Sequence, residues 1–179
     1  MTGMIDTEDR TFPEALADVA GVSFAHADGD GYGVDYEPYA AFPSAEETTE
    51  WIRAWTGNQE LDGDAFLPFG MDGTGGQVAF HRVRPGRPPA EQPVVFLGSE
   101  GEVRVLARDL SGFLWLLADG YGPLDFVWSE RRAPRPHAGL AAIAARHGGV
   151  GSRRPAAETV AAAAAEFPAF EDETFALCR

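Results

Sequence analysis

Apolar residues recur at helical spacing in two short segments near the N-terminus. Each segment opens with Thr or Ser followed three residues later by Glu, which is the signature of a capping box, and each closes at a glycine. The pattern predicts helices over residues 11–21 and 44–57, opened by Thr11 and Ser44. Between them, "VSFAHADGDGYGVDYEPY" alternates apolar and polar residues around a Gly-Asp turn, which predicts a hairpin of two short strands.

A series of apolar runs follows and predicts a sheet. Four runs, AFLPFG, GQVAFHRV, PVVFLG and EVRVLA, are bounded by Gly, Pro and charged turn residues. The last two predict a hairpin with residues 99–102 at its tip, whereas RPGRPPAEQP is a polar loop. Next, RDLSGFLWLLADG has helical spacing and predicts a buried helix. We therefore expect an α+β fold, with a mixed, mostly antiparallel sheet and helices packed against it.

The composition changes after Gly122. SERRAPRPH is typical of a linker, and two Ala-rich stretches, HAGLAAIAARHG and AAETVAAAAAEF, combine high helix propensity with little apolar area to bury. The sequence is therefore divided into an α+β domain at residues 1–122 and a linker with Ala-rich C-terminal helices at residues 123–179. We expect these helices to form a peripheral cap or a partly mobile end.

Charge is distributed unevenly along the chain. All 14 basic residues are arginine, against 28 Asp and Glu, and the formal net charge is −14. Residues 1–82 hold 16 of the acidic residues and only 3 of the arginines. Such a field repels nucleic acid and anionic lipid and attracts basic protein surfaces. The alternative is that acidity simply keeps the protein soluble.

The sequence also bears on the cellular compartment. The single cysteine, Cys178, cannot form an internal disulfide, and this favours a reducing environment. No apolar run approaches the roughly 18 to 20 residues of a membrane span. The N-terminus is acidic and has no apolar secretory segment. We expect a cytoplasmic protein that does not associate with membranes.

The segment "FLPFGMDGTGGQVAFHR" is the first candidate for chemistry. A phosphate-binding P-loop requires a lysine, which this chain lacks, and the dinucleotide fingerprint fails because Val78 replaces its last glycine. An alternative is a small-ligand site or an enzyme centre in which Asp72 and His81 converge across a hairpin. The favoured interpretation is a structural turn between two strands, formed by residues that suit tight backbone conformations: Gly70, Asp72, Gly73, Thr74, Gly75 and Gly76.

The other candidate sites match known metal or catalytic patterns only in part or not at all. In residues 28–37, Asp28 and Asp30 match the first ligand positions of an EF-hand, but tyrosines occupy two later ones. An exposed acidic turn is favoured there over a cation site. The four histidines lack metal-ligand spacing, and Ser99 and Cys178 lack the context of catalytic nucleophiles. We expect no metal, no cofactor and no catalytic residue.

The order of strand, glycine turn, strand, hairpin and helix resembles the SUKH superfamily, whose fungal members regulate cell-wall synthesis. The resemblance covers roughly residues 10–120 and depends on "FLPFGMDGTGGQVAFHR", "QPVVFLGSEGEVRVLARDLSGFLWLLADG" and, more loosely, "YGVDYEPYAAFPSAEETTEWIRAWTGN". The matching positions in the turn and the helix are Phe69, Gly70, Asp72, Gly73, Gly75, Gly76, Phe113, Leu114, Leu116 and Leu117. The resemblance implies an α+β domain without a catalytic centre. Bacterial members resemble immunity proteins that neutralise toxins, many of them nucleases.

Resemblance and charge together predict a non-catalytic immunity protein that binds a basic, nuclease-type toxin through an acidic surface. Complementary charge would accelerate association with such a partner. The residues predicted to form this surface are all acidic and come from the N-terminal third: Asp28, Asp30, Asp35, Glu37, Glu46, Glu47 and Glu50. The alternatives are the small-ligand or enzyme site at Asp72 and His81, and a regulatory scaffold without a toxin partner.

Overall fold

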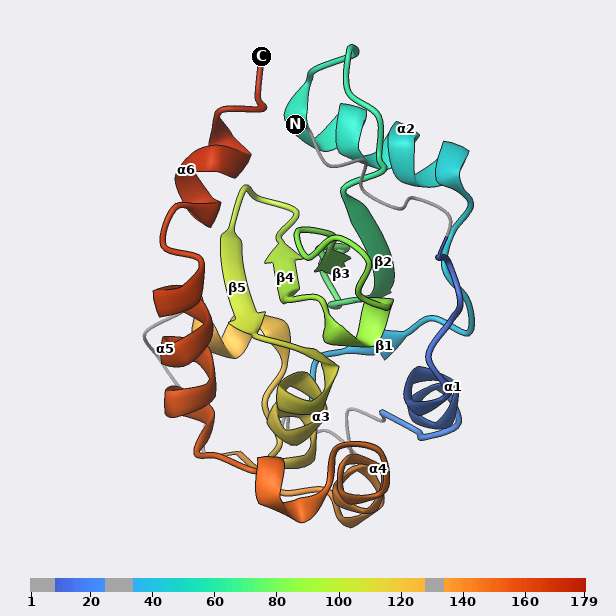
Figure 1. The fold of residues 1–179 in the computed structure, drawn as a ribbon, viewed down its shortest axis with the longest axis vertical. Helices are drawn as coiled ribbons and strands as arrows, with labels where there is room; N and C mark the ends of the chain where they lie inside the picture. The colour runs from blue at the N-terminus through green and yellow to red at the C-terminus, as the bar shows by residue number, and fades with distance from the viewer. Residues whose placement is uncertain (1–8, 25–33, 128–133) are drawn as a thin grey trace.

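The computed structural model describes residues 9–24, 34–127 and 134–179. Its centre is one five-stranded antiparallel sheet in which each strand pairs with its neighbours in sequence (Figure 1). The strands are β1 (Glu37–Pro38), β2 (Phe66–Met71), β3 (Gln77–His81), β4 (Val94–Leu97) and β5 (Val103–Ala107). The expected α+β fold is confirmed, and the sheet is wholly antiparallel among the described residues.

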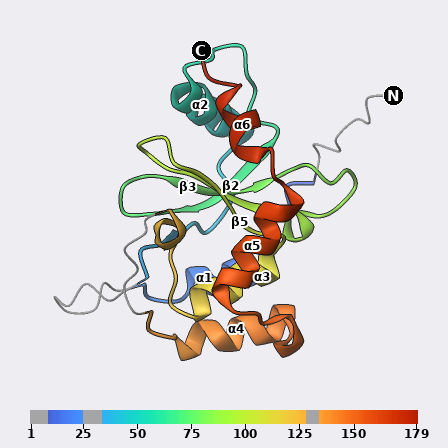
Figure 2. The same ribbon diagram turned by 90° about the vertical axis from the view of Figure 1, so that its left-hand side faces the viewer.

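Helices cover both faces of the sheet. One face carries α1 (Glu14–Ala20), α3 (Leu110–Ala118) and α4 (Ala138–Gly148), and the other carries α2 (Ala45–Thr56) and α6 (Phe170–Phe175). Helix α5 (Ala156–Glu166) lies along the edge strand β5 and contributes to the cores on both faces. Figure 2 shows the sheet between α2 and α6 on one side and α1, α3 and α4 on the other. Short 3₁₀ helices lie in the connections, at Pro89–Glu91, Pro123–Phe126 and Val150–Ser152.

The two covered faces explain the apolar runs of the strands. Successive side chains of a strand point to opposite faces. In β4, Val94 and Phe96 therefore enter the core beneath α3, while Val95 and Leu97 enter the core beneath α2 and α6. All four of these residues are buried. A strand buried on both faces has no reason to alternate with polar residues, and the run PVVFLG is accordingly continuous.

The N-terminal segment departs from two expectations. Helix α1 begins at Glu14, because Pro13 is extended and occupies the N-cap position without a side-chain cap. The capping box expected from Thr11 is therefore wrong, and the Thr11 backbone N–H instead donates to the Asp9 carboxylate. The helix ends before Gly21, as expected.

The expected hairpin of two strands after this helix is also wrong for the described residues. Residues 22–24 and 34–36 form no strand, and the pairing to β2 begins only at Glu37. The reason is that Phe24 and Tyr36 pack edge-to-face with each other, and Tyr36 packs likewise on Phe113 of α3. The apolar residues that alternate along this segment are therefore explained by packing in the core, and not by hydrogen bonding between two strands. The intervening residues 25–33, with Asp28 and Asp30, lie outside the described residues.

The Ala-rich helices belong to the cores on both sides of the sheet. Leu140, Ile143 and Ala144 of α4 share one core with the sheet and α3, and Ala163 of α5 lies in the other core beside β5. The small alanine side chains allow close approach to these surfaces. The helices are therefore not a cap at the periphery, and the hydrophobic core continues across residue 122.

The second capping box forms as expected at the start of α2. The Ser44 hydroxyl accepts from the Glu47 backbone N–H at 3.1 Å, and a Glu47 carboxylate oxygen accepts from the Ser44 N–H at 2.7 Å. Replacing Ser44 with alanine removes one partner of this reciprocal pair. We expect a loss of about 1 kcal/mol in the free energy of unfolding, measured by urea denaturation. Thr11→Ala is the control and should leave stability unchanged, because Thr11 caps nothing.

Candidate functional site

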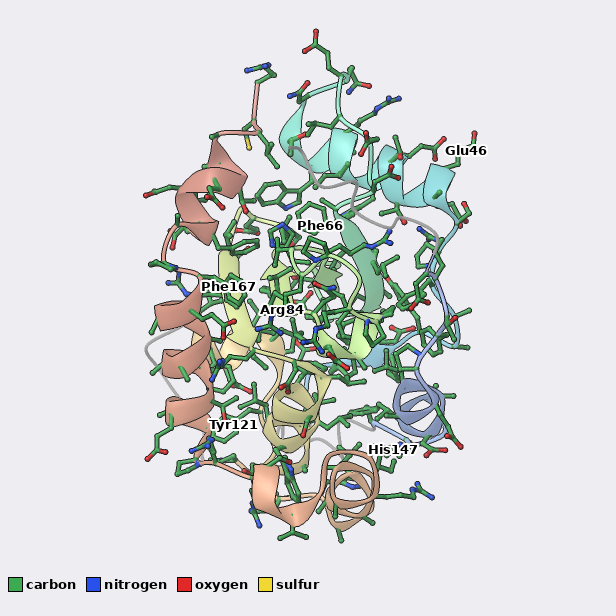
Figure 3. The ribbon with its side chains drawn as sticks, viewed as in Figure 1. Glu46, Phe66, Arg84, Tyr121, His147 and Phe167 are labelled. Atoms are coloured by element: carbon green, nitrogen blue, oxygen red, sulfur yellow. The ribbon has the colours of Figure 1, made fainter. Side chains whose placement is uncertain are left out.

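The acidic residues singled out in the sequence fall in two places. Glu46, Glu47 and Glu50 lie on the exposed side of α2, and Glu46 extends into solvent (Figure 3). Asp35 and Glu37 lie at β1, where an Asp35 carboxylate oxygen accepts from the Gly73 N–H at 2.8 Å. Only the first group belongs to a continuous helical surface.

Helix α6 lies against the C-terminal end of α2. The Phe175 ring stacks on Trp55 with centroids 6.5 Å apart, and the Asn58 amide donates to the Leu177 carbonyl at 3.0 Å. The Arg179 N–H donates to the Thr56 carbonyl at 3.0 Å. These contacts bring together segments that are more than a hundred residues apart in sequence.

This contact gathers nine exposed carboxylates at one end of the molecule, the upper end in Figure 1. They come from α2, from the loop at residues 57–64 and from α6. We call this surface the acidic end, and its members are Glu46, Glu47, Glu50, Glu60, Asp62, Asp64, Glu171, Asp172 and Glu173. Two arginines close to it are engaged: the Arg53 Nε donates to the Leu61 carbonyl, and Arg104 pairs with Glu171 at 2.9 Å. Arg179, whose backbone is bound to the end of α2, is exposed and adds one positive charge at this end.

Glu47 differs from its neighbours in the acidic end. Its hydrogen bonds with Ser44, chiefly the one from the Ser44 backbone N–H, lower the pKa of its carboxyl below the usual value. Its carboxylate is therefore committed to the start of α2. Glu46 and Glu50 are exposed and make no side-chain hydrogen bond or ion pair with the described part of the chain.

The glycine-rich segment forms the hairpin turn between β2 and β3. The buried Asp72 carboxylate accepts from the Gly76 N–H at 2.8 Å and from both the N–H and the hydroxyl of Thr74, at 3.0 and 2.8 Å. Gly75 adopts a φ of 92°, which side chains rarely tolerate. The turn thus uses its own carboxylate to hold its backbone, and that carboxylate is not directed at a ligand.

Asp72 and His81 lie at opposite ends of β3. In the sheet register, Gln77 next to the turn faces Met71, whereas His81 faces Phe66. The His81 ring stacks on Phe66 with centroids 5.0 Å apart and lies 5.1 Å from Phe170. The structure therefore does not bring Asp72 and His81 together.

His81 is partly buried, and aromatic rings lie against its imidazole. Burial among aromatic rings lowers the pKa of its imidazole from 6.5 to about 4. Its Nδ1 is buried and has no hydrogen-bond partner among the described residues. With this pKa the imidazole is mostly neutral near neutral pH.

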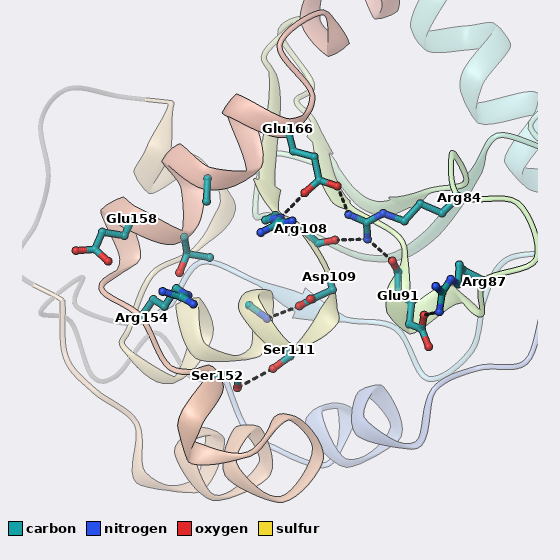
Figure 4. A pocket seen from close by; sticks show the side chains of 13 residues that line it. Arg84, Arg87, Glu91, Arg108, Asp109, Ser111, Ser152, Arg154, Glu158 and Glu166 are labelled. Carbon is teal, nitrogen blue, oxygen red and sulfur yellow. Dashed lines mark hydrogen bonds and ion pairs between the residues drawn. The ribbon is translucent and has the colours of Figure 1, made fainter.

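Sequence reasoning missed a groove on another part of the surface. A cavity of about 890 Å³ lies between α5, the start of α3 and the loop after β3 (Figure 4). Four arginines line it, and we call it the arginine groove: Arg84, Arg87, Arg108 and Arg154. They come from three separate segments of the sequence, so no local motif predicted the groove.

Within residues 9–24, 34–127 and 134–179, no group of three or more His, Cys, Asp or Glu side chains is arranged to hold a metal ion. None of the helices in these ranges has the length and apolar character needed to cross a bilayer. Comparison of the chain with protein-family models, curated proteins and solved structures found no match.

Proposed function

We propose that this protein is a non-catalytic binding module of the immunity type, and that its acidic end docks onto a basic surface of a toxin. One observation carries the proposal: exposed carboxylates from α2, the loop at residues 57–64 and α6 are gathered at one end by packing between distant segments. The resemblance to SUKH proteins supplies the class of partner, a toxic enzyme such as a nuclease. Nucleases are basic where they bind their substrate.

The acidic end also offers an apolar anchor. Phe175 is 45% exposed and stacks on Trp55, whose indole N–H donates to the Gly98 carbonyl at 2.8 Å. Interfaces commonly combine a central aromatic contact with a polar rim, and the aromatic residues contribute most of the binding energy. The carboxylates around Phe175 would steer the partner into place, and the Phe175 ring would slow its release.

The test begins with a partner captured from the host. It must be toxic when expressed alone and harmless when this protein is co-expressed. With that partner, Glu46→Lys/Glu50→Lys should lower the association rate constant about tenfold at low salt and flatten its dependence on ionic strength. Glu47 is left intact, because reversing it would disturb the start of α2.

The control carries the same number of reversals elsewhere, at Glu14 and Glu158. Both are exposed and, like Glu46, lie in the first turn of a helix, so the effect on the helix dipole is similar. The control should associate at the wild-type rate in stopped-flow measurements. Equal rates for both double variants would refute the acidic end as the docking surface.

A further inference from the structure

The arginine groove is built around a guanidinium that is held rigidly. The Arg84 Nη1 donates to the carbonyl oxygens of Glu91 and Arg108, and its Nη2 donates to a Glu166 carboxylate oxygen at 2.5 Å. The guanidinium also lies over the Phe167 ring, 5.5 Å from its centroid. Arg84 therefore has a fixed orientation before any ligand arrives, which reduces the entropy lost on binding.

A single carboxylate serves two arginines in this groove. Glu166 accepts from Arg84 through one oxygen and from the Arg108 Nε through the other. These contacts, the hydrogen bond from Arg84 first, lower the pKa of the Glu166 carboxyl. Because Arg108 is engaged only at Nε among the described residues, its terminal Nη groups remain directed to solvent.

Four carboxylates, those of Glu91, Asp109, Glu158 and Glu166, also line the groove, but they do not engage all of its guanidinium groups. Arg154 has no ion pair within the described chain, and Arg87, which pairs with Glu91, is 64% exposed. The Asp109 carboxylate is occupied as the cap of α3, where it accepts from the Gly112 N–H at 2.9 Å. Glu158 also lines the groove (Figure 4) but makes no ion pair with an arginine within the described ranges.

We propose that the arginine groove binds a small, multiply charged anion bearing phosphate or carboxylate groups. Guanidinium forks match the paired oxygens of both groups. The volume of about 890 Å³ lies within the range of small-molecule sites, and the Ser111 and Thr159 residues at its wall are polar. In the free protein, Glu166 occupies the position between Arg84 and Arg108 that one anionic group of the ligand would take.

The negative net charge of the chain does not oppose such binding. At physiological ionic strength, charges more than about 8 Å apart across solvent are largely screened. The ligand therefore responds chiefly to the four guanidinium groups and the four carboxylates that line the groove. This site is separate from the acidic end and does not depend on the proposed function.

The experiment is isothermal titration calorimetry of the full chain with inorganic pyrophosphate, and separately with citrate, at an ionic strength fixed with sodium chloride. We expect saturable 1:1 binding of at least one of the two. Arg154→Gln should weaken it about tenfold, the loss of one charge-assisted contact. Pyrophosphate alone would identify a phosphate ligand, and citrate alone a carboxylate ligand.

A second variant removes the Glu166 carboxylate, which competes with the ligand for Arg84 and Arg108. Glu166→Gln keeps the side-chain shape but frees Arg84 and Arg108, so it should tighten binding several-fold even if it destabilises the fold slightly. Glu171→Gln is the matched control, because it releases Arg104 from an ion pair outside the groove. Absence of saturable binding in both the wild type and Glu166→Gln would overturn the proposal. So would equal affinities for Glu166→Gln and Glu171→Gln.

Discussion

Replacing Gly70 with alanine is expected to lower the free energy of unfolding by about 3 kcal/mol, the upper range for overpacking a core. A Cβ at this position would lie 2.3 Å from the Tyr36 hydroxyl oxygen and 2.5 Å from its Cζ. The Tyr36 ring cannot yield easily, because it is 3% exposed and held between Phe24 and Phe113. Displacing it also disturbs the hydrogen bond from its hydroxyl to the Phe69 carbonyl.

A double-mutant cycle with Tyr36→Ala tests this cause. Without the ring, the added methyl group has room, so Gly70→Ala should cost almost nothing in the Tyr36→Ala background. Gly75→Ala provides a contrast, since nothing lies within 4 Å of its Cβ position and only the positive φ opposes it. That variant should lose about 1–2 kcal/mol. Additive losses for Gly70→Ala and Tyr36→Ala in urea denaturation would exclude the steric explanation.

The second large effect is a dependence of stability on pH that originates at His81. Its pKa is about 4 in the folded protein against 6.5 in an exposed histidine. Below pH 6.5 the unfolded chain takes up a proton that the folded protein does not, so stability falls as the pH is lowered towards 4. Between pH 6.5 and pH 4 this difference in pKa lowers the free energy of unfolding by about 3 kcal/mol. Below pH 4 His81 causes little further loss, because it is then protonated in the folded protein as well.

His81→Phe isolates this contribution from that of the many carboxylates. A phenyl ring retains the contacts with Phe66 and Phe170 and removes a buried nitrogen without a hydrogen-bond partner in the described part of the chain, so stability at pH 7 should change little. The difference in unfolding free energy between His81→Phe and wild type should then grow as the pH falls from 6.5 to 4.5. Parallel urea midpoints across this range would show that His81 titrates normally.

The sequence predicted those parts of the fold in which the pattern of neighbouring residues matches the burial that each residue has in the structure. Strands β2 to β5 were correctly expected because apolar runs of strand length are separated by Gly and Pro turns. The predicted start of α2 was correct, because the capping box consists of hydrogen bonds between Ser44 and Glu47 alone. The segment around Tyr36 was misread, since alternating apolar residues contact a helix that is distant in sequence.

The candidate sites were predictable only in part, for the same reason. The carboxylates of α2 were visible as a local cluster, but their union with those of α6 depends on the packing of Phe175 on Trp55. The arginine groove gave no signal, because Arg84, Arg108 and Arg154 come from separate elements. A surface assembled from distant segments becomes visible only when the chain is folded.

The attachment of residues 177–179 to α2 has a practical consequence for work with this protein. Two hydrogen bonds hold these residues at the end of α2: the Asn58 amide donates to the Leu177 carbonyl, and the Arg179 N–H donates to the Thr56 carbonyl. An affinity tag or fluorescent fusion placed directly after Arg179 would lie beside these hydrogen bonds and beside the acidic end, the surface that we propose binds a partner. Expression vectors for capture experiments should therefore separate any C-terminal fusion by a long flexible spacer.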